Sequence, residues 1–119
     1  MDRILSCVEK GYIPIITKGY TRVAELGEVM YIDRLDGCTV MHTRKEEFRV
    51  NVKMKDLAEA LEGTPRFFAC HSQLIINLDL VRHMENGYIW FEGGGTVYLG
   101  IHSFTRARKR FNDYITNGN

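Results

Sequence analysis

Glycine-containing turns divide the chain into short apolar segments, and this division limits the folds open to it. Asp36-Gly37 and Asn86-Gly87 accept the two left-handed backbone conformations of a tight type I′ hairpin turn. Lys18-Gly19 and the glycines of residues 93–95 separate further apolar segments. Segments joined by such turns pair as successive antiparallel hairpins. The turns therefore predict a mainly β protein.

The apolar segments themselves alternate with the two-residue period of a strand. In residues 96–102, for example, Val97, Leu99 and Ile101 share one face of the predicted strand. We predict strands at residues 12–17, 20–25, 29–34, 38–44, 47–52, 66–70, 74–78, 80–84, 88–92 and 96–101.

One internal segment has a helical period instead. Residues 54–63 place their apolar side chains on one stripe and end at Gly63, a normal residue after a helix. Residues 1–11 are either a short helix, with Ile4, Leu5 and Val8 on one side, or the tail of a linker. We therefore place the domain at residues 12–119.

The last segment, residues 104–116, predicts a terminal helix whose outer face is basic. Ser103 is available as its N-cap. The apolar face of this helix consists of Phe104, Ala107, Phe111 and Ile115. Three basic residues lie on the far side: Arg106, Lys109 and Arg110. They are either an ordinary solvated face or a patch that meets an anionic partner.

From its length we expect the chain to bury a single core and not two. The residues expected in it are Leu57, Leu61, Ile75, Val97, Leu99 and Phe111.

Composition excludes several classes of protein. With 119 residues the chain has the length of one domain. No apolar stretch reaches the roughly 18 residues that span a bilayer, and charges near the N-terminus do not fit a signal peptide. The three cysteines are odd in number and far apart, which fits free thiols in the cytoplasm better than a disulfide scaffold. The net charge of +1 by itself predicts no nucleic-acid partner.

The stretch "RFFACHSQLIIN", residues 66–77, interrupts an apolar run with polar groups. Cys70 and His71 are neighbours on a predicted strand, so they point to opposite faces and cannot form a nucleophile–base pair. Cys70 is interpreted as a small buried hydrophobe, with a reactive thiol as the alternative. The sequence contains no recognisable acid–base or nucleophile constellation, so we do not expect an enzyme. The four histidines lie on different elements without metal-ligand spacing, so we expect no metal and no other cofactor.

The same stretch carries a family resemblance. "RFFACHSQLIINLDLV" is similar to the F-x-x-x-H-x-S-x-x-V-N-x-x-x-I signature of LytTR-type DNA-binding domains, the output modules of many bacterial response regulators in two-component systems. "EVMYIDRLDGCTVMHT", "MKDLAEAL" and "VRHMENGYIWFEGGGTVYLGIHSF" resemble further family segments in the right order, and a basic helix follows. The resemblance covers about residues 12–115.

This resemblance implies an elongated β-β-β sandwich of small antiparallel sheets, with a short internal helix and a C-terminal helix. It also implies transcription regulation by sequence-specific binding of double-stranded DNA, with loops in successive major grooves. The expected base contacts are Gly37, Cys38, Ser72, Gln73, His102 and Ser103. The expected backbone contacts are His71, Arg106, Lys109 and Arg110.

The loops depart from the family pattern at several positions. Ser72 stands where Arg or Asn is usual, and Gln73 stands where the family has Ser. Gly37 has no side chain, and His102 replaces an Arg or Ser. We expect His71 to shape its turn through hydrogen bonds, while Leu74 returns to the core.

The resemblance further implies paired direct repeats in the DNA, with two copies of the chain per site and self-association there. If the chain is a fragment, a receiver domain belongs to the same protein. The alternative function is a β-rich protein-interaction module without DNA readout.

Overall fold

The computed structural model describes the backbone of residues 2–117, and their side chains from residue 4 onward. In this part of the chain, ten strands form three antiparallel sheets. The strands are β1 (Tyr12–Ile16), β2 (Thr21–Glu25), β3 (Val29–Leu35), β4 (Cys38–Thr43), β5 (Glu47–Val50), β6 (Phe67–His71), β7 (Leu74–Asn77), β8 (Val81–Glu85), β9 (Tyr88–Phe91) and β10 (Thr96–Tyr98). The helices are α1 (Asp2–Glu9), α2 (Met54–Leu61) and α3 (Ile101–Thr116), and short 3-10 turns are η1 (Leu26–Glu28) and η2 (Leu78–Leu80). The prediction of a mainly β fold with an internal and a terminal helix is confirmed.

The hairpin turns have the backbone conformations that their residues predict. Asp36 and Gly37 have φ angles of 52° and 78°, and Asn86 and Gly87 have 52° and 90°. Both residues of each turn are left-handed, as a type I′ turn requires. The local sequence therefore determines these two hairpins.

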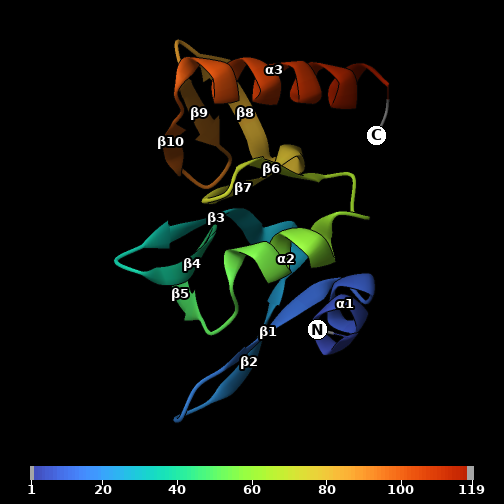
Figure 1. Cartoon of the computed structure of the whole chain (residues 1–119), viewed down its shortest axis with the longest axis vertical. Coiled ribbons are helices and arrows are strands. Elements are labelled where there is room, and N and C mark those ends of the chain that lie inside the picture. The colour runs from blue at the N-terminus through green and yellow to red at the C-terminus, as the bar shows by residue number, and fades with distance from the viewer. Residues whose placement is uncertain (1, 118–119) are drawn as a thin grey trace.

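The sheets are stacked along the long axis of a body that measures 41 × 29 × 24 Å (Figure 1). At one end, α1 lies beside the β1–β2 hairpin. The middle layer is a five-stranded sheet of order β5-β4-β3-β7-β6, with α2 beside it. At the other end, α3 lies along the three-stranded sheet β10-β9-β8. The pairing of β3 with β7, through Tyr31 and Ile76, joins the N-terminal strands to the C-terminal ones.

Two core clusters lie on the two sides of the middle sheet, so the expectation of a single core is wrong. The first joins α1, α2, the β1–β2 hairpin and β3 to β5 with Phe67 and Ile75. The second joins the other buried residues of β6 to β9 with α3 and Met30 of β3. Leu57, Leu61, Ile75 and Leu99 are at most 2% exposed, which confirms four of the predicted core residues. Val97 and Phe111 are half-buried and pack against the second cluster.

The N-terminal segment is the short helix of the two alternatives. Val8 is buried in the first core cluster, and Ile4 packs against it. Leu5 is 47% exposed, so its expected place on the apolar side is wrong.

The start of the terminal helix corrects the sequence prediction. α3 begins at Ile101, with Gly100 in the N-cap position and no side chain capping it. Ser103 therefore lies in the first turn of the helix and is not its N-cap. Because β10 ends at Tyr98, Ile101 leaves the strand and is 76% exposed.

The buried face of α3 also differs near its end. Ala107 is buried, and Phe111 and Tyr114 pack on the second cluster, whereas Ile115 is 58% exposed. Steps of four and three residues keep this stripe in line with the 3.6-residue period, so Tyr114 takes the place predicted for Ile115.

Candidate nucleic-acid interface

The three segments predicted to face DNA lie along one side of the long axis. They are the β3–β4 turn, the β6–β7 turn and the junction of β10 with α3, all at the left of the view in Figure 1. Each lies at the end of a strand or a helix, where the backbone is accessible.

The β6–β7 turn is a two-residue hairpin loop shaped by a histidine. His71 pairs with Leu74, which leaves Ser72 and Gln73 as the exposed loop residues. The backbone N–H of Gln73 donates to Nδ1 of His71 over 3.1 Å. The expectation that His71 shapes this turn is confirmed, and Leu74 is buried as expected.

Cys70 lies directly before this turn and is fully buried. The register of β6 against β7 shifts between Ala69 and His71, so Cys70 is the extra residue of a bulge. Burial raises the pKa of the Cys70 thiol to about 12, against a smaller opposing effect of the Arg106 charge. A protonated, inaccessible thiol is a poor nucleophile, which confirms the interpretation of Cys70 as a small hydrophobe.

The β3–β4 turn presents backbone and few side-chain atoms. No atom lies within 4 Å of where a Cβ on Gly37 would stand, so the turn has open space around it. Cys38 is half-buried, and Nη1 of Arg49 lies 3.8 Å from its Sγ. This tip can approach a partner closely through its main chain.

At the third segment, the expected loop residues belong to a helix. His102 and Ser103 lie in the first turn of α3, so their placement in a loop between strand and helix is wrong. His102 is exposed and Ser103 is half-buried. Both remain next to the exposed junction at Gly100.

Three basic residues of α3 have a partner, whereas the exposed Arg108 has none among the described residues. Arg106 donates from Nη1 to the carbonyl of Cys70 over 2.9 Å, and Arg110 donates from Nη2 to the carbonyl of Pro65 over 2.6 Å. Lys109 has an 80% exposed side chain, whose Nζ lies 3.4 Å from a carboxylate oxygen of Asp113. The prediction that all three lie on the far side of the helix is wrong for the two arginines.

The reason is the position of β6 at the edge of the middle sheet. Its outer carbonyls have no neighbouring strand to donate to them, and backbone groups near an interior need partners. Arg106 supplies one such hydrogen bond, to Cys70, and its guanidinium carbon also lies 5.7 Å from the ring centre of Phe68. Arg110 binds the carbonyl of Pro65, in the segment just before β6. The two arginines therefore attach α3 to the middle sheet.

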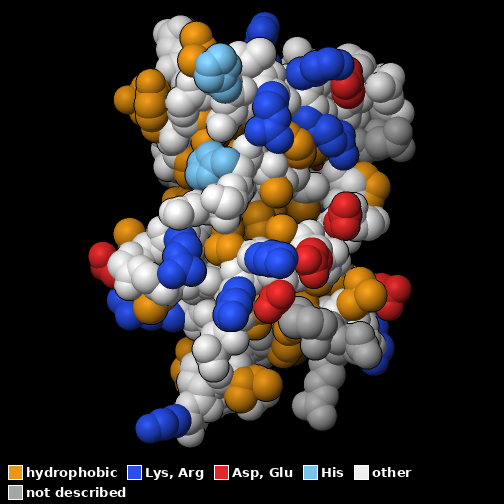
Figure 2. Space-filling view, in the orientation of Figure 1, with side chains coloured by type: hydrophobic (Ala, Val, Ile, Leu, Met, Phe, Trp, Pro, Cys, Tyr) orange, Lys and Arg blue, Asp and Glu red, His pale blue; other side chains and the backbone are white. Residues whose placement is uncertain are grey.

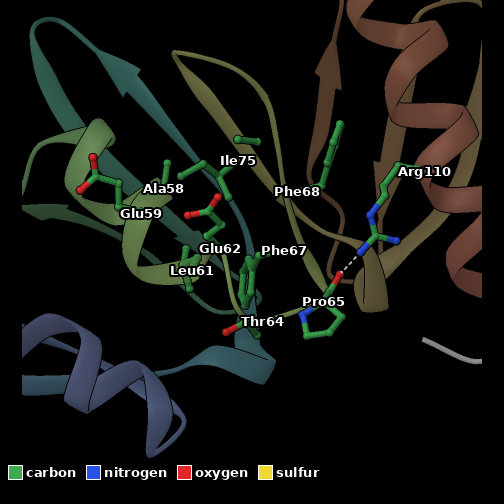
Figure 3. Close-up of a pocket in the computed structure, with 11 residues that line it drawn as sticks. Ala58, Glu59, Leu61, Glu62, Thr64, Pro65, Phe67, Phe68, Ile75 and Arg110 are labelled. Atoms are coloured by element: carbon green, nitrogen blue, oxygen red, sulfur yellow. Dashed lines mark hydrogen bonds between the residues drawn. The ribbon is translucent and has the colours of Figure 1, made fainter.

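A cavity of about 410 Å³ lies between α2 and β6, with Arg110 at its rim (Figure 3). Phe67, Phe68 and Ile75 line it, together with the carboxylates of Glu59 and Glu62. These carboxylates make the cavity unsuitable for a phosphate group.

A larger groove lies beside the β3–β4 turn and was not predicted. Its volume is about 1000 Å³, and Gly37 and Cys38 line it. Its charged lining residues are Lys18, Arg34, Arg49, Lys53 and Asp56. The sequence carries no local signal for this cluster, because the cations come from different elements.

The described residues contain neither a metal-ligand cluster nor a membrane-spanning helix. Among residues 2–117, no group of three or more His, Cys, Asp or Glu side chains is placed to hold a metal ion. In the same part of the chain, no helix has the length and hydropathy needed to cross a membrane.

Comparisons with known proteins agree with this architecture. The model of the LytTr DNA-binding domain family matches residues 20–112. A solved structure of a LytTr DNA-binding domain, from a Bacillus cereus protein described as a methyl-accepting/DNA response regulator, is similar with a TM-score of 0.71. This similarity covers 84% of this chain and 95% of the other at 16% sequence identity, which shows a shared fold. No curated protein matches the sequence significantly.

Proposed function

The chain belongs to the LytTr DNA-binding domain family, and we propose that it reads a specific sequence in double-stranded DNA through its exposed turns. Family membership supports DNA binding in transcription regulation. The finer proposal is that the three segments enter successive major grooves, in the bacterial cytoplasm.

The observation that carries this proposal is the β6–β7 turn. The hydrogen bond between His71 Nδ1 and the Gln73 N–H holds the loop in one shape, with Ser72 and Gln73 exposed at its tip. A short polar side chain on an ordered loop can offer a donor or acceptor to a base edge at low entropic cost. We propose base contacts for Ser72 and Gln73 and a backbone contact for His71.

The other two segments complete the proposed reading surface. Gly37 and Cys38 present main-chain groups at the β3–β4 turn, and His102 and Ser103 present side chains from the first turn of α3. Lys109, whose side chain is 80% exposed, is an α3 cation accessible to a phosphate, and Arg108 is exposed beside it. Arg106 and Arg110 have donors left beyond their carbonyl bonds, so a phosphate contact by either is compatible with its structural bond.

A binding selection followed by substitution tests the assignment of readers. Duplexes that bind the chain are first selected from a random library, which provides a cognate sequence. Ser72→Ala and His102→Ala are then titrated on the cognate and on a scrambled duplex. We expect each to cost roughly 1–3 kcal/mol on the cognate and much less on the scrambled sequence.

Matched controls are Ser6→Ala and His83→Ala, which remove exposed side chains of the same types from other elements. They should bind both duplexes as the wild type does. If His102→Ala lowers both affinities equally, His102 is a backbone contact and not a reader. If the selection enriches no sequence, the proposed specificity is wrong.

A second candidate function, a protein-interaction module without DNA readout, has one observation in its favour. Tyr88, Trp90 and Tyr98 are 44%, 37% and 64% exposed on the three-stranded sheet. Their rings contact one another, with the centroids of Tyr88 and Tyr98 4.8 Å apart. Exposed aromatic clusters are typical of binding surfaces. No binding to any duplex at low salt would favour this candidate.

A further inference from the structure

We propose that the groove beside the β3–β4 turn holds the sugar–phosphate backbone of the bound duplex. This inference rests on the proposed DNA binding and adds a second contact surface, separate from α3. The groove is lined by four cations and one acid, which are Lys18, Arg34, Arg49, Lys53 and Asp56.

Four separate elements bring these cations together. Lys18 lies at the tip of the β1–β2 hairpin, Arg34 near the end of β3, Arg49 on β5 and Lys53 directly before α2. All four residues are exposed. Lys and Arg side chains appear both over α3 and further down the view, toward β4, β5 and the tip of β1–β2 (Figure 2).

The four groove cations lie close together without acidic partners among the described residues, whereas several other arginines of the chain are paired. Arg22, Arg44 and Arg82 each form an ion pair with a glutamate. In the described part of the chain, none of the four groove cations does so. A cluster of unpaired like charges repels itself, and a polyanion that replaces the surrounding small ions removes this repulsion.

The groove is continuous with the proposed reading surface. Gly37 and Cys38 line it, and the contact of Arg49 with the Cys38 sulfur places a guanidinium directly beside the turn. A turn that enters a major groove has a phosphate strand on each side, so cations beside it are within reach of one of them.

The size of the groove also fits a nucleic-acid backbone. Its volume of about 1000 Å³ is at the upper limit of small-molecule sites, and its lining combines five charged residues with apolar ones, so it can contact both phosphates and sugars. The body is 41 Å long, which corresponds to about 12 base pairs at roughly 3.4 Å per pair. Phosphate contacts at α3 and in the groove would therefore extend over about one turn of the duplex.

The test measures binding to any duplex over a range of salt concentrations, because phosphate contacts do not depend on sequence. Lys18→Ala, Arg49→Ala and Lys53→Ala should each weaken binding equally on cognate and scrambled DNA. Each should also flatten the slope of log affinity against log salt by about 0.9. Asp56→Asn should strengthen binding to both duplexes, because it removes the one acid of the groove.

Lys10→Ala and Lys45→Ala are the matched controls, since both remove exposed lysines outside the groove. They should leave the slope unchanged. A second readout is amine modification of the wild-type protein: DNA should protect Lys18 and Lys53 but not Lys10. Thermal unfolding of the lysine and arginine variants should match the wild type, because these side chains are exposed.

The outcomes separate the two proposals. If the groove variants keep the wild-type slope and Lys18 stays reactive in the complex, the groove proposal is wrong while the base readers stand. If the wild type binds no duplex, both proposals fall. Binding of an acidic protein, with no slope change on DNA, would assign the groove to that partner instead.

Discussion

Cys70 illustrates how burial alone decides the chemistry of a side chain. It is fully buried behind the β6–β7 turn, while Cys7 and Cys38 are half-buried. Burial favours the neutral thiol and raises its pKa from an ordinary value of 9.0 to about 12. The buried thiol therefore contributes to folding only while it keeps its proton.

We expect the free energy of unfolding to fall in alkaline solution through this group. Below pH 9 the thiol is protonated in both states, so its contribution is complete. Between pH 9 and about 12 it ionises in the unfolded chain but stays protonated in the folded one. Each pH unit in this window should lower the free energy of unfolding by about 1.4 kcal/mol. Urea titrations at several pH values should show this decrease for the wild type but not for Cys70→Ala. If the free energy of unfolding of both proteins changes with pH in the same way, the expectation is wrong.

Asn77 is the residue of the family signature whose role only the structure reveals. It is fully buried, and its Nδ2 donates to the carbonyls of Leu26 and Val29 over 3.3 and 2.8 Å. Its Oδ1 accepts from the N–H of Asp79. One amide group thus connects η1 and β3 to the end of β7.

Asn77→Ala should lower the free energy of unfolding by about 2–3 kcal/mol, because it leaves buried backbone groups without partners. Denaturant titration gives this value. Asn112→Ala, at an exposed position on α3, is the control and should change stability by less than about 0.5 kcal/mol. Equal effects of the two variants would show that the Asn77 hydrogen bonds do not stabilise the fold.

At the scale of elements, the attachment of α3 to β6 is the contact most relevant to DNA binding. It positions the first turn of the helix, with His102 and Ser103, relative to the β6–β7 turn. The attachment consists of apolar packing through Ala107 together with the hydrogen bonds of Arg106 and Arg110.

Arg106→Ala should therefore destabilise the fold by about 1–2 kcal/mol, since it removes a charge-assisted hydrogen bond to the Cys70 carbonyl. Lys109→Ala should leave stability within about 0.5 kcal/mol, because the ion pair of Lys109 is exposed. Thermal unfolding monitored by circular dichroism distinguishes the two. If both variants unfold at the same temperature as the wild type, Arg106 has no structural role.

At the scale of the whole molecule, the elongated shape and the single reading side suggest how two copies would share a site. Direct repeats place both copies in the same orientation, so any contact between them is head-to-tail. The proposed reading segments can face the same side of the DNA only when the repeats are separated by whole helical turns.

We expect two copies per duplex when the repeats lie about 10–11 base pairs apart, and tighter binding than to a single repeat. An added half turn of about 5 base pairs moves the second copy to the opposite face and should remove this gain. Sedimentation of the complexes gives the stoichiometry, and titrations give the affinities. An affinity that does not change with spacing would exclude self-association on DNA.

Local chemistry determined most of the secondary structure. All ten strands overlap the predicted segments, although β10 ends at Tyr98 and not at residue 101, because a two-residue period and a type I′ turn depend only on neighbours in the chain. The shape of the β6–β7 turn follows for the same reason, since His71 bonds to a residue two positions away.

Only the tertiary structure decided which strands share a sheet and which cations are free. β3 pairs with β7 across more than forty residues, and this places β6 at an edge of the sheet. There the Cys70 carbonyl accepts from Arg106, and the Pro65 carbonyl, just before β6, accepts from Arg110. The same folding brings Lys18 and Lys53 into one groove. Neither arrangement has a period or a motif in the sequence, because long-range pairing depends on the combined burial of all the elements and not on any one segment.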